Sequence, residues 1–310
     1  MLSYSIRRIL GAIPTLLIIV AIAFFMMRLA PGGPFDQDRA LPPQIEANIL
    51  AKYNLDQPLY KQFTDYLFGI LQGDFGPSIK VQDFTVSELI ASSLPVTLQL
   101  GFTAMFLAVI LGTGFGAFAA LKQNSGLDYA VMATAMTGIT IPNFVMAPLL
   151  TLVFGVYLSW LPVGGWGGGA IANKILPITA LALPQIAYIA RLTRGSMIEV
   201  LHSNFIRTAR AKGLSEATVI RRHALKPALL PVISFMGPAT AGLITGSVVI
   251  EKIFSIQGIG SYFVQGAMNR DYTLVMGVVI FYGALIIFFN FLVDLIYAWL
   301  NPRVRYGPNG

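Results

Sequence analysis

The sequence predicts an all-α polytopic membrane protein with six transmembrane helices. Only 11% of its 310 residues are charged, whereas a soluble domain carries about a quarter, and its mean hydropathy is +0.70. The apolar residues lie in long uncharged runs, and a helix that spans a bilayer needs roughly 20 such residues. Five or seven spans are the alternatives to six. The runs cover residues 9–27, 96–121, 129–173, 175–190, 227–250 and 272–293.

The first apolar run is expected to be a retained transmembrane helix, within an N-terminal segment 1–30. Arg7 and Arg8 precede it, as the basic flank of a signal peptide would. However, the run exceeds the roughly 7–15 residues of a signal-peptide apolar region, and no small-x-small cleavage site stands before Arg28. We therefore expect this segment to anchor the chain.

Residues 31–95 are expected to form a helical loop outside the membrane. Leu41-Pro42-Pro43 favours a short helix that runs to residue 53. Asp56 and Pro58 then resemble an N-cap and a first-turn proline. A second helix follows, because five apolar residues recur at helical spacing before Gly73, a residue that favours a helix end. Those five are Leu59, Phe63, Tyr66, Leu67 and Ile70.

In the second span, small residues indicate close packing between helices. Ala108, Gly112, Gly116 and Ala120 recur every four residues. Small residues at that spacing let helix backbones approach closely in lipid. We therefore expect this face to pack against another helix and not to bind a ligand.

The third span holds Pro142 and Pro148, which are expected to kink it because proline interrupts the helical hydrogen-bond ladder. Charge within the spans is nearly absent. Arg191 and Arg194 are expected to extend to the inner surface, and Asp294 to pair with an arginine there. A lack of buried acids disfavours a transporter driven by an ion gradient.

The distribution of lysine and arginine predicts which side each loop faces. The loop 31–95 holds four basic and eight acidic residues, whereas the loop 191–226 holds eight basic and two acidic residues. An excess of Lys and Arg marks the cytoplasmic side. We therefore expect 31–95 outside, 191–226 inside, and both termini, including the tail 303–310, in the cytoplasm.

The sequence lacks the usual motifs of catalysis and cofactor binding. No Gly-Lys dipeptide occurs, so the chain has no phosphate-binding loop of the ATPase kind. It has no cysteine, and neither His202 nor His223 has nearby residues that would complete a zinc site. No clustered catalytic set and no single-strand-binding pattern of aromatic and basic residues occurs either. We expect no enzyme activity, cofactor, metal or nucleic acid.

The basic loop 199–226 is the candidate functional site. Ser203 is placed to cap a short helix and Gly213 to end it, and Ser215 to cap a second helix. Two interpretations stay open: a rigid lever beneath a docking surface, or a basic loop held by anionic lipid headgroups. The candidate site residues are the apolar Phe205, Ile206 and Ala209, the basic Arg207, Arg210 and Lys212, and Gly213.

This loop resembles the E-A-A-x-x-x-G signature of the permease subunits of bacterial ATP-binding-cassette (ABC) importers. Ala209 and Gly213 match the signature, whereas Arg207 and Thr208 replace its glutamate and first alanine. That departure is typical of the peptide and nickel branch, which looks like R-T-A-R-A-K-G-L followed by H-A-L-x-x-A-L-L-P. The segments similar to this branch are 25–32, 73–76, 207–214, 223–231, 258–260, 269–272 and 301–303.

The resemblance covers essentially the whole chain and implies the type I ABC importer permease fold, with its core at residues 96–302. It implies a subunit of the bacterial inner membrane that moves oligopeptides, with a dipeptide or nickel importer as the alternative. The implied partners are a second related permease, two cytoplasmic ATPases that use ATP and Mg, an extracytoplasmic peptide-binding protein and membrane lipid. The candidate site residues would then contact the ATPases.

Three other classes fit the sequence less well. They are an ion-coupled secondary transporter, a polytopic membrane enzyme and a non-transporting assembly factor. The polar residues Gln99, Asn143, Gln185 and Asn290 lie within spans, but each is more often a hydrogen bond between helices than a contact with a transported molecule. The sequence does not assign residues to a translocation path.

Overall fold

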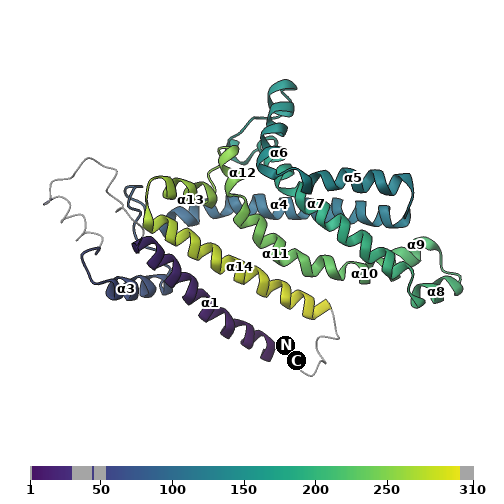
Figure 1. Ribbon diagram of the computed structural model, residues 1–310, viewed down its shortest axis with the longest axis horizontal. Helices are drawn as coiled ribbons and strands as arrows, with labels where there is room; N and C mark the ends of the chain where they lie inside the picture. The colour runs from purple at the N-terminus through teal and green to yellow at the C-terminus, as the bar shows by residue number, and fades with distance from the viewer. Residues whose placement is uncertain (1, 30–43, 45–53, 301–310) are drawn as a thin grey trace. The chain divides into compact units, whose positions relative to one another are not determined.

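The structure is a computed structural model that describes residues 2–29, 44 and 54–300, and these residues are mostly helical (Figure 1). They divide into two compact units. The large unit comprises Thr97–Ile256 and the chain from Phe288 onward, and the small unit comprises Leu2–Val96 and Gln257–Ile287. Among the described residues the β-structure is one isolated bridge, between Pro77 and Thr85. The all-α prediction is confirmed.

The small unit is built on α1 (Leu2–Leu29), α3 (Leu59–Leu71) and α13 (Ile259–Met268). Helix α3 packs through the apolar residues that predicted it, with the Phe63 ring 5.3 Å from that of Phe24 on α1. Pro58, not Asp56, occupies its N-cap position. Gly73 follows α3 with a φ of 78°, as expected of a helix-ending glycine. The helix expected at 41–53 lies outside the described residues, apart from residue 44. The sequence did not predict α13.

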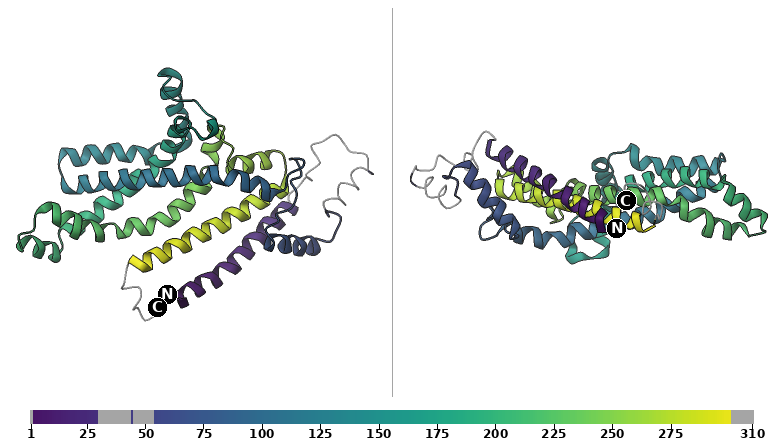
Figure 2. Two further views of the ribbon diagram at one scale, coloured as in Figure 1. Left: turned by 180° about the vertical axis from the view of Figure 1, so that it is seen from behind. Right: turned by 90° about the horizontal axis from the view of Figure 1, so that it is seen from below.

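The large unit contains the helices that follow. They are α4 (Val86–Leu121, which begins in the small unit), α5 (Gly126–Thr140), α6 (Asn143–Leu150), η1 (Thr151–Tyr157), the short η2 (Gly167–Gly169), α7 (Ile171–Leu201), α8 (Asn204–Ala211), α9 (Glu216–Thr218), η3 (Val219–Ala224), α10 (Leu225–Ala228), α11 (Leu230–Gly246) and α12 (Val248–Ile253). Helix α14 (Tyr272–Leu300) starts in the small unit and ends in the large one. Helices α4, α5 and α7 lie side by side in Figures 1 and 2.

The number of apolar spans agrees with the prediction of six. Five helices of the described part are long and apolar enough to cross a membrane, and a sixth span results if α5 and the segment Asn143–Tyr157 count as one. These two pieces meet at an angle of 104°. Pro142 sits at the break as the N-cap of α6. The predicted kink is therefore present at Pro142, and it is large enough to divide the span.

The small residues of α4 pack against α7, as predicted. A Cβ atom added at Gly116 would lie 2.4 Å from the Ala190 carbonyl oxygen, and one added at Gly112 would lie 2.8 Å from Ile189 side-chain atoms. Ala108 is fully buried. Helix backbones at this contact are therefore close enough that only a residue without a side chain fits.

The prediction that the spans lack buried acids is wrong. Asp128 and Glu251 lie within candidate spans and are fully buried, and Asp271, one residue before the last span, is 1% exposed. The Glu251 Oε1 atom accepts hydrogen bonds from the Thr97 hydroxyl at 2.9 Å and the Ser247 hydroxyl at 2.7 Å. Asp271 accepts from the backbone N–H groups of Ile79, Lys80 and Leu274 and from the Ser78 hydroxyl. Most of the donors that hold these carboxyl groups are far away in the sequence or belong to the backbone, and composition does not reveal such donors.

Candidate coupling loop

The candidate site begins where α7 ends. After Leu201 a turn at His202 and Ser203 leads into α8, and α8 and α9 lie together at one end of the large unit (Figure 1). Ser203 occupies the N-cap position with an extended backbone, but its hydroxyl caps no helical N–H group. That hydroxyl donates to the Val200 carbonyl oxygen at 2.6 Å. Ser203 therefore joins the turn to the end of α7 and does not cap α8 in the predicted way.

The inner face of α8 belongs to the core of the chain. Ile206 is fully buried and Ala209 is 6% exposed. Both pack in one cluster with Met197 of α7 and with Val219 and Ala224 of η3. The sequence placed Ile206 and Ala209 in the docking surface, and this part of the assignment has to change. The spacing of three residues puts their side chains on one face of the helix, and that face holds the loop to α7.

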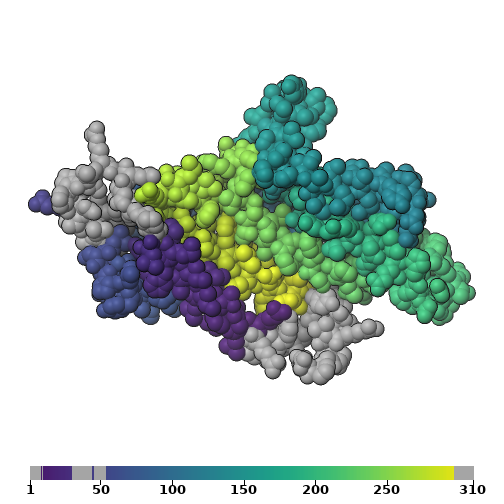
Figure 3. All heavy atoms as spheres, in the orientation of Figure 1, coloured from purple at the N-terminus to yellow at the C-terminus, as the bar shows by residue number. Residues whose placement is uncertain are grey.

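The outer face of α8 carries the other candidate residues. Phe205 is 49% exposed, and Arg207, Arg210 and Lys212 are also exposed. The Arg210 Nε atom lies 2.8 Å from the Glu216 carboxylate, which links α8 to α9. Both partners of this ion pair face solvent, so it adds little to stability. The green atoms at the right of Figure 3 mark this part of the surface. One exposed aromatic ring and an excess of positive charge describe its chemistry.

Gly213 has the left-handed backbone that the sequence predicted. Its φ is 77°, and its N–H group donates to the Arg210 carbonyl oxygen at 2.9 Å. No atom lies within 4 Å of the place where a Cβ atom would be. Space is therefore not the reason for glycine here. The requirement is conformational, because residues with a side chain adopt positive φ at a cost.

The second helix of the loop is not a regular α-helix. It comprises α9, the π-helix η3 (Val219–Ala224) and α10. The Ser215 hydroxyl lies 2.9 Å from that of Thr218 and caps no helical N–H group. Wide turns of the π type are frequently found at functional sites. The predicted second helix is thus a helical segment whose hydrogen-bond pattern changes twice within thirteen residues, from 216 to 228.

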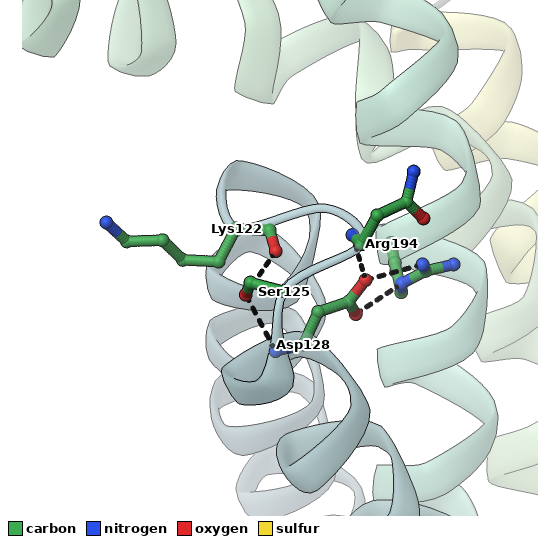
Figure 4. A network of polar contacts seen from close by, with 5 residues as sticks. Lys122, Ser125, Asp128 and Arg194 are labelled. Atoms are coloured by element: carbon green, nitrogen blue, oxygen red, sulfur yellow. Dashed lines mark hydrogen bonds and ion pairs between the residues drawn. The ribbon is translucent and has the colours of Figure 1, made fainter.

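An ion pair between the buried Asp128 and the half-buried Arg194 fixes the start of α5 to α7, a short distance before the loop (Figure 4). The Arg194 guanidinium donates to both Asp128 carboxylate oxygens, from Nε and Nη2, at 2.7 Å each. Asp128 also accepts from the Asn124 N–H group at 2.9 Å. Ser125 caps α5 by accepting a hydrogen bond from the Asp128 N–H group at 3.3 Å. The turn between α4 and α5 is therefore tied to α7 ten residues before α8 begins.

Sequence reasoning missed this contact because it treated Arg194 as a residue that extends to the membrane surface. One signal was available: Asp128 is the sole acidic residue between Glu88 and Glu199. An isolated acid within apolar sequence has few possible partners, and a nearby arginine is the most favourable of them. In the described part of the chain, no group of three or more His, Cys, Asp or Glu residues is placed to hold a metal ion.

Two family models match the sequence. Residues 112–306 match the family described as binding-protein-dependent transport system inner membrane component. Residues 1–101 match the N-terminal region of binding-protein-dependent transport system membrane components. Together the matched segments include the candidate loop and the Asp128–Arg194 contact.

Curated relatives are similar over the whole chain. The oligopeptide transport system permease protein OppB of Escherichia coli K12 is 60% identical over 306 residues, which are 99% of this chain and all of that protein. OppB of Haemophilus influenzae is 54% identical over the same shares. The dipeptide transport system permease protein DppB of Bacillus subtilis is 44% identical over 310 residues, all of both chains.

Solved structures share the fold at low sequence identity. A chain from the MetNI methionine ABC transporter in inward-facing conformations aligns with a TM-score of 0.60 and 18% identity. The alignment covers 69% of this chain and 96% of that one. A chain from an amino acid ABC transporter aligns with a TM-score of 0.52 and 19% identity, over 69% and 94% of the two chains. At such low sequence identities these alignments show a shared fold and nothing further.

Proposed function

Since this chain belongs to the family of binding-protein-dependent transport system inner membrane components, we propose that it is the permease subunit of an ATP-driven importer of oligopeptides. The observation that carries the proposal is the 60% identity with OppB along all of that protein's length. The 44% identity with DppB makes a dipeptide importer the second candidate. Oligopeptide import is favoured because its relatives are more similar over equal coverage.

The proposed partners follow from the same membership. They are a second related permease, two cytoplasmic ATPases of the ABC type and an extracytoplasmic peptide-binding protein. This subunit would be non-catalytic, and the ATPases would bind ATP and Mg. The outer face of α8, with Phe205, Arg207, Arg210 and Lys212 exposed, is the surface that we assign to the ATPase contact. Ile206 and Ala209 would act indirectly, by fixing α8 to α7.

The route of motion in this proposal runs through α7. When an ATPase moves α8, the buried Ile206 cluster moves the end of α7 with it. The Asp128–Arg194 ion pair and the tight α4–α7 contact make α5 and α4 follow. The 104° break beyond Thr140 is then a natural place for the span to change its angle. Such a bundle would alternate between two packed states, as alternating access requires.

The buried acids do not favour an ion-coupled mechanism. Asp128 is paired with Arg194, and Asp271 and Glu251 accept hydrogen bonds from backbone or hydroxyl donors. Proton-coupled transporters use acidic groups that gain and lose protons along a path. Carboxyl groups with these fixed donors fit a structural role better.

The proposed function is tested by reconstituting the permease pair, the ATPases and the loaded binding protein in vesicles. We expect uptake of a labelled oligopeptide that requires ATP and continues when an uncoupler removes the proton gradient. Uptake that follows the gradient without ATP would refute the proposal. A complex that moves dipeptides but not longer peptides would select the second candidate.

The proposed topology has both termini and the loop 191–226 in the cytoplasm, because six crossings return the chain to its starting side and basic residues mark that side. A cysteine introduced at Gln72 or Gly168 should react with an impermeant reagent added outside intact cells, and one introduced at Arg210 should not. The chain has no cysteine of its own, so labelling reports the introduced site. Labelling at Arg210 would refute this topology.

A further inference from the structure

The spans of the large unit expose two different kinds of surface. Helix α4 exposes large apolar side chains, among them Phe102, Phe106, Ile110 and Phe118, which suit contact with lipid tails. Helix α7 exposes Tyr188, Arg191 and Gly195, and α11 exposes Ser234, Pro238 and Gly242. Residues at these three- and four-residue intervals share one face of each helix. The second surface has fewer large apolar side chains than the α4 surface, and it carries one arginine.

The glycines on this second surface are not explained by packing within the chain. No atom lies within 4 Å of a Cβ atom added at Gly195 or Gly242. At Gly101, by contrast, the added atom would lie 2.6 Å from the Ile244 side chain. Glycine inside a helix costs about 1 kcal/mol relative to alanine. Gly114 of α4 is open in the same way, so the open glycines show only that the exposed faces of α7 and α11 have room beside Arg191.

Arg191 is the charged group on this surface. Its guanidinium carbon lies 5.2 Å from the centre of the Tyr188 ring, and that ring contacts Phe235 of α11 at 5.9 Å. Among the described residues no carboxylate forms an ion pair with Arg191, whereas Arg194 is bound by Asp128. An arginine within an apolar span is a candidate functional residue by default.

The direction of the Arg191 side chain argues against a contact with the inner membrane surface. Tyr188 lies one turn before Arg191, farther from the α8 end of α7. The guanidinium group therefore extends away from the basic loop and back along the helix. A side chain that reached for headgroups on the basic side would extend toward α8 instead. The Tyr188 ring holds the guanidinium through a cation–π contact, and a guanidinium carries five N–H donors in a planar fork.

We propose that Arg191, held by Tyr188, binds a carboxylate of the transported peptide on a path wall formed by the exposed faces of α7 and α11. The inference rests on the proposed function and adds a substrate contact to it. A guanidinium recognises a planar carboxylate through two parallel hydrogen bonds. The C-terminal carboxylate is the one that peptides of different sequence share. Small neighbours such as Gly195 and Gly242 leave room for the varied side chains.

The test uses the complete reconstituted complex and two peptides without acidic side chains, one with a free C-terminus and one with a C-terminal amide. Both peptides are supplied bound to a saturating concentration of the binding protein. For each peptide, the amount taken up is divided by the amount of ATP hydrolysed. We expect the wild-type complex to move the free acid more efficiently. Arg191→Gln should lower its uptake per ATP about tenfold, the size of one hydrogen bond to a charged group, and leave the amide unchanged. Arg191→Lys should keep part of the preference for the peptide with a free C-terminus.

Lys61→Gln is the matched control, because it removes one exposed cation from the small unit and should keep the preference. A preference retained by Arg191→Gln would overturn the inference. An equal fall in the uptake of both peptides would also overturn it, because that result would indicate that Arg191 contacts lipid phosphate or the second permease. If the wild-type complex moves neither peptide, the proposed function itself is refuted. If it moves both peptides equally well, the function stands and the carboxylate contact is wrong.

Discussion

The segment from α7 to α8 has an inner face that the chain itself holds and an outer face that it leaves to other molecules. On the inner face, Arg194 is bound by Asp128 and Ile206 is fully buried. On the outer face, Arg191 and Phe205 are exposed. Arg194 thus has an outer counterpart of the same charge three positions away, and the apolar Ile206 has an apolar outer counterpart at the adjacent position. Residue type alone therefore does not separate structural from functional roles, and variants on the two faces should fail in different ways.

The largest effect is expected at Arg194. Arg194→Ala leaves the buried Asp128 carboxylate without its cation, which should cost about 3–5 kcal/mol of unfolding free energy. Thermal unfolding in detergent measures this loss, and little folded protein should be recovered. Arg191→Ala, three residues earlier, should unfold at the wild-type temperature. Equal stability of the two variants would remove the distinction between the faces.

The next comparison is between Ile206 and Phe205. Ile206→Asp forces a carboxylate into the α8 cluster and should destabilise the chain by several kcal/mol. Phe205→Asp places the same charge on the exposed face and should leave stability within about 0.5 kcal/mol. It should nevertheless uncouple ATP hydrolysis from uptake, because the docking surface changes. Uptake per ATP in the reconstituted complex, measured beside thermal unfolding, separates these outcomes. Normal coupling in Phe205→Asp would show that the exposed face of α8 does not dock the ATPase.

Gly213 is exposed, yet its positive φ restricts which residues can replace it. Gly213→Val should cost about 1–2 kcal/mol, since a β-branched side chain is poorly tolerated at positive φ. Gly213→Asn should cost less, because asparagine adopts this region more readily. We expect transport to follow the same order, with Asn retaining more uptake than Val at equal expression. If both variants transport equally, the conformation of Gly213 is not needed for coupling.

The smallest change in stability among the glycine variants is expected at Gly195, whose surroundings differ from those of Gly116. Gly116→Ala places a Cβ atom 2.4 Å from a backbone oxygen of α7 and should destabilise the chain by about 1–3 kcal/mol. Gly195→Ala has open space around it and should stabilise the helix by up to about 1 kcal/mol. Thermal unfolding shows whether each substitution raises or lowers the stability of the chain. If Gly195→Ala lowers uptake while raising stability, the open space itself serves transport.

The features that the sequence predicted correctly are local ones. Span positions follow from runs of apolar residues, α3 follows from apolar residues at helical spacing, and the conformation of Gly213 follows from its place after α8. Each of these depends on neighbours within one or two turns. The glycine stripe of α4 is also a local pattern, although its partner α7 had to be found in the structure.

The features that the sequence did not predict depend on distant partners. Asp128 and Arg194 are 66 residues apart, and Thr97 and Glu251 are 154 apart. For the candidate loop, the sequence identified the helix and its residues but assigned Ile206 to the wrong face. Both faces of so short a helix carry apolar residues. What covers each one is decided by tertiary packing, here by Met197 and by η3.

The Asp128–Arg194 ion pair also imposes an order on membrane insertion. The carboxylate emerges from the ribosome 66 residues before its cation. At about 5–20 residues per second the delay is roughly 3–13 s. During this time α5 holds an uncompensated acid at its first turn, where the helix dipole favours a negative charge. The helix can dock stably only once α7 arrives. We therefore expect α5 to reach its final packing only after α7 has been made.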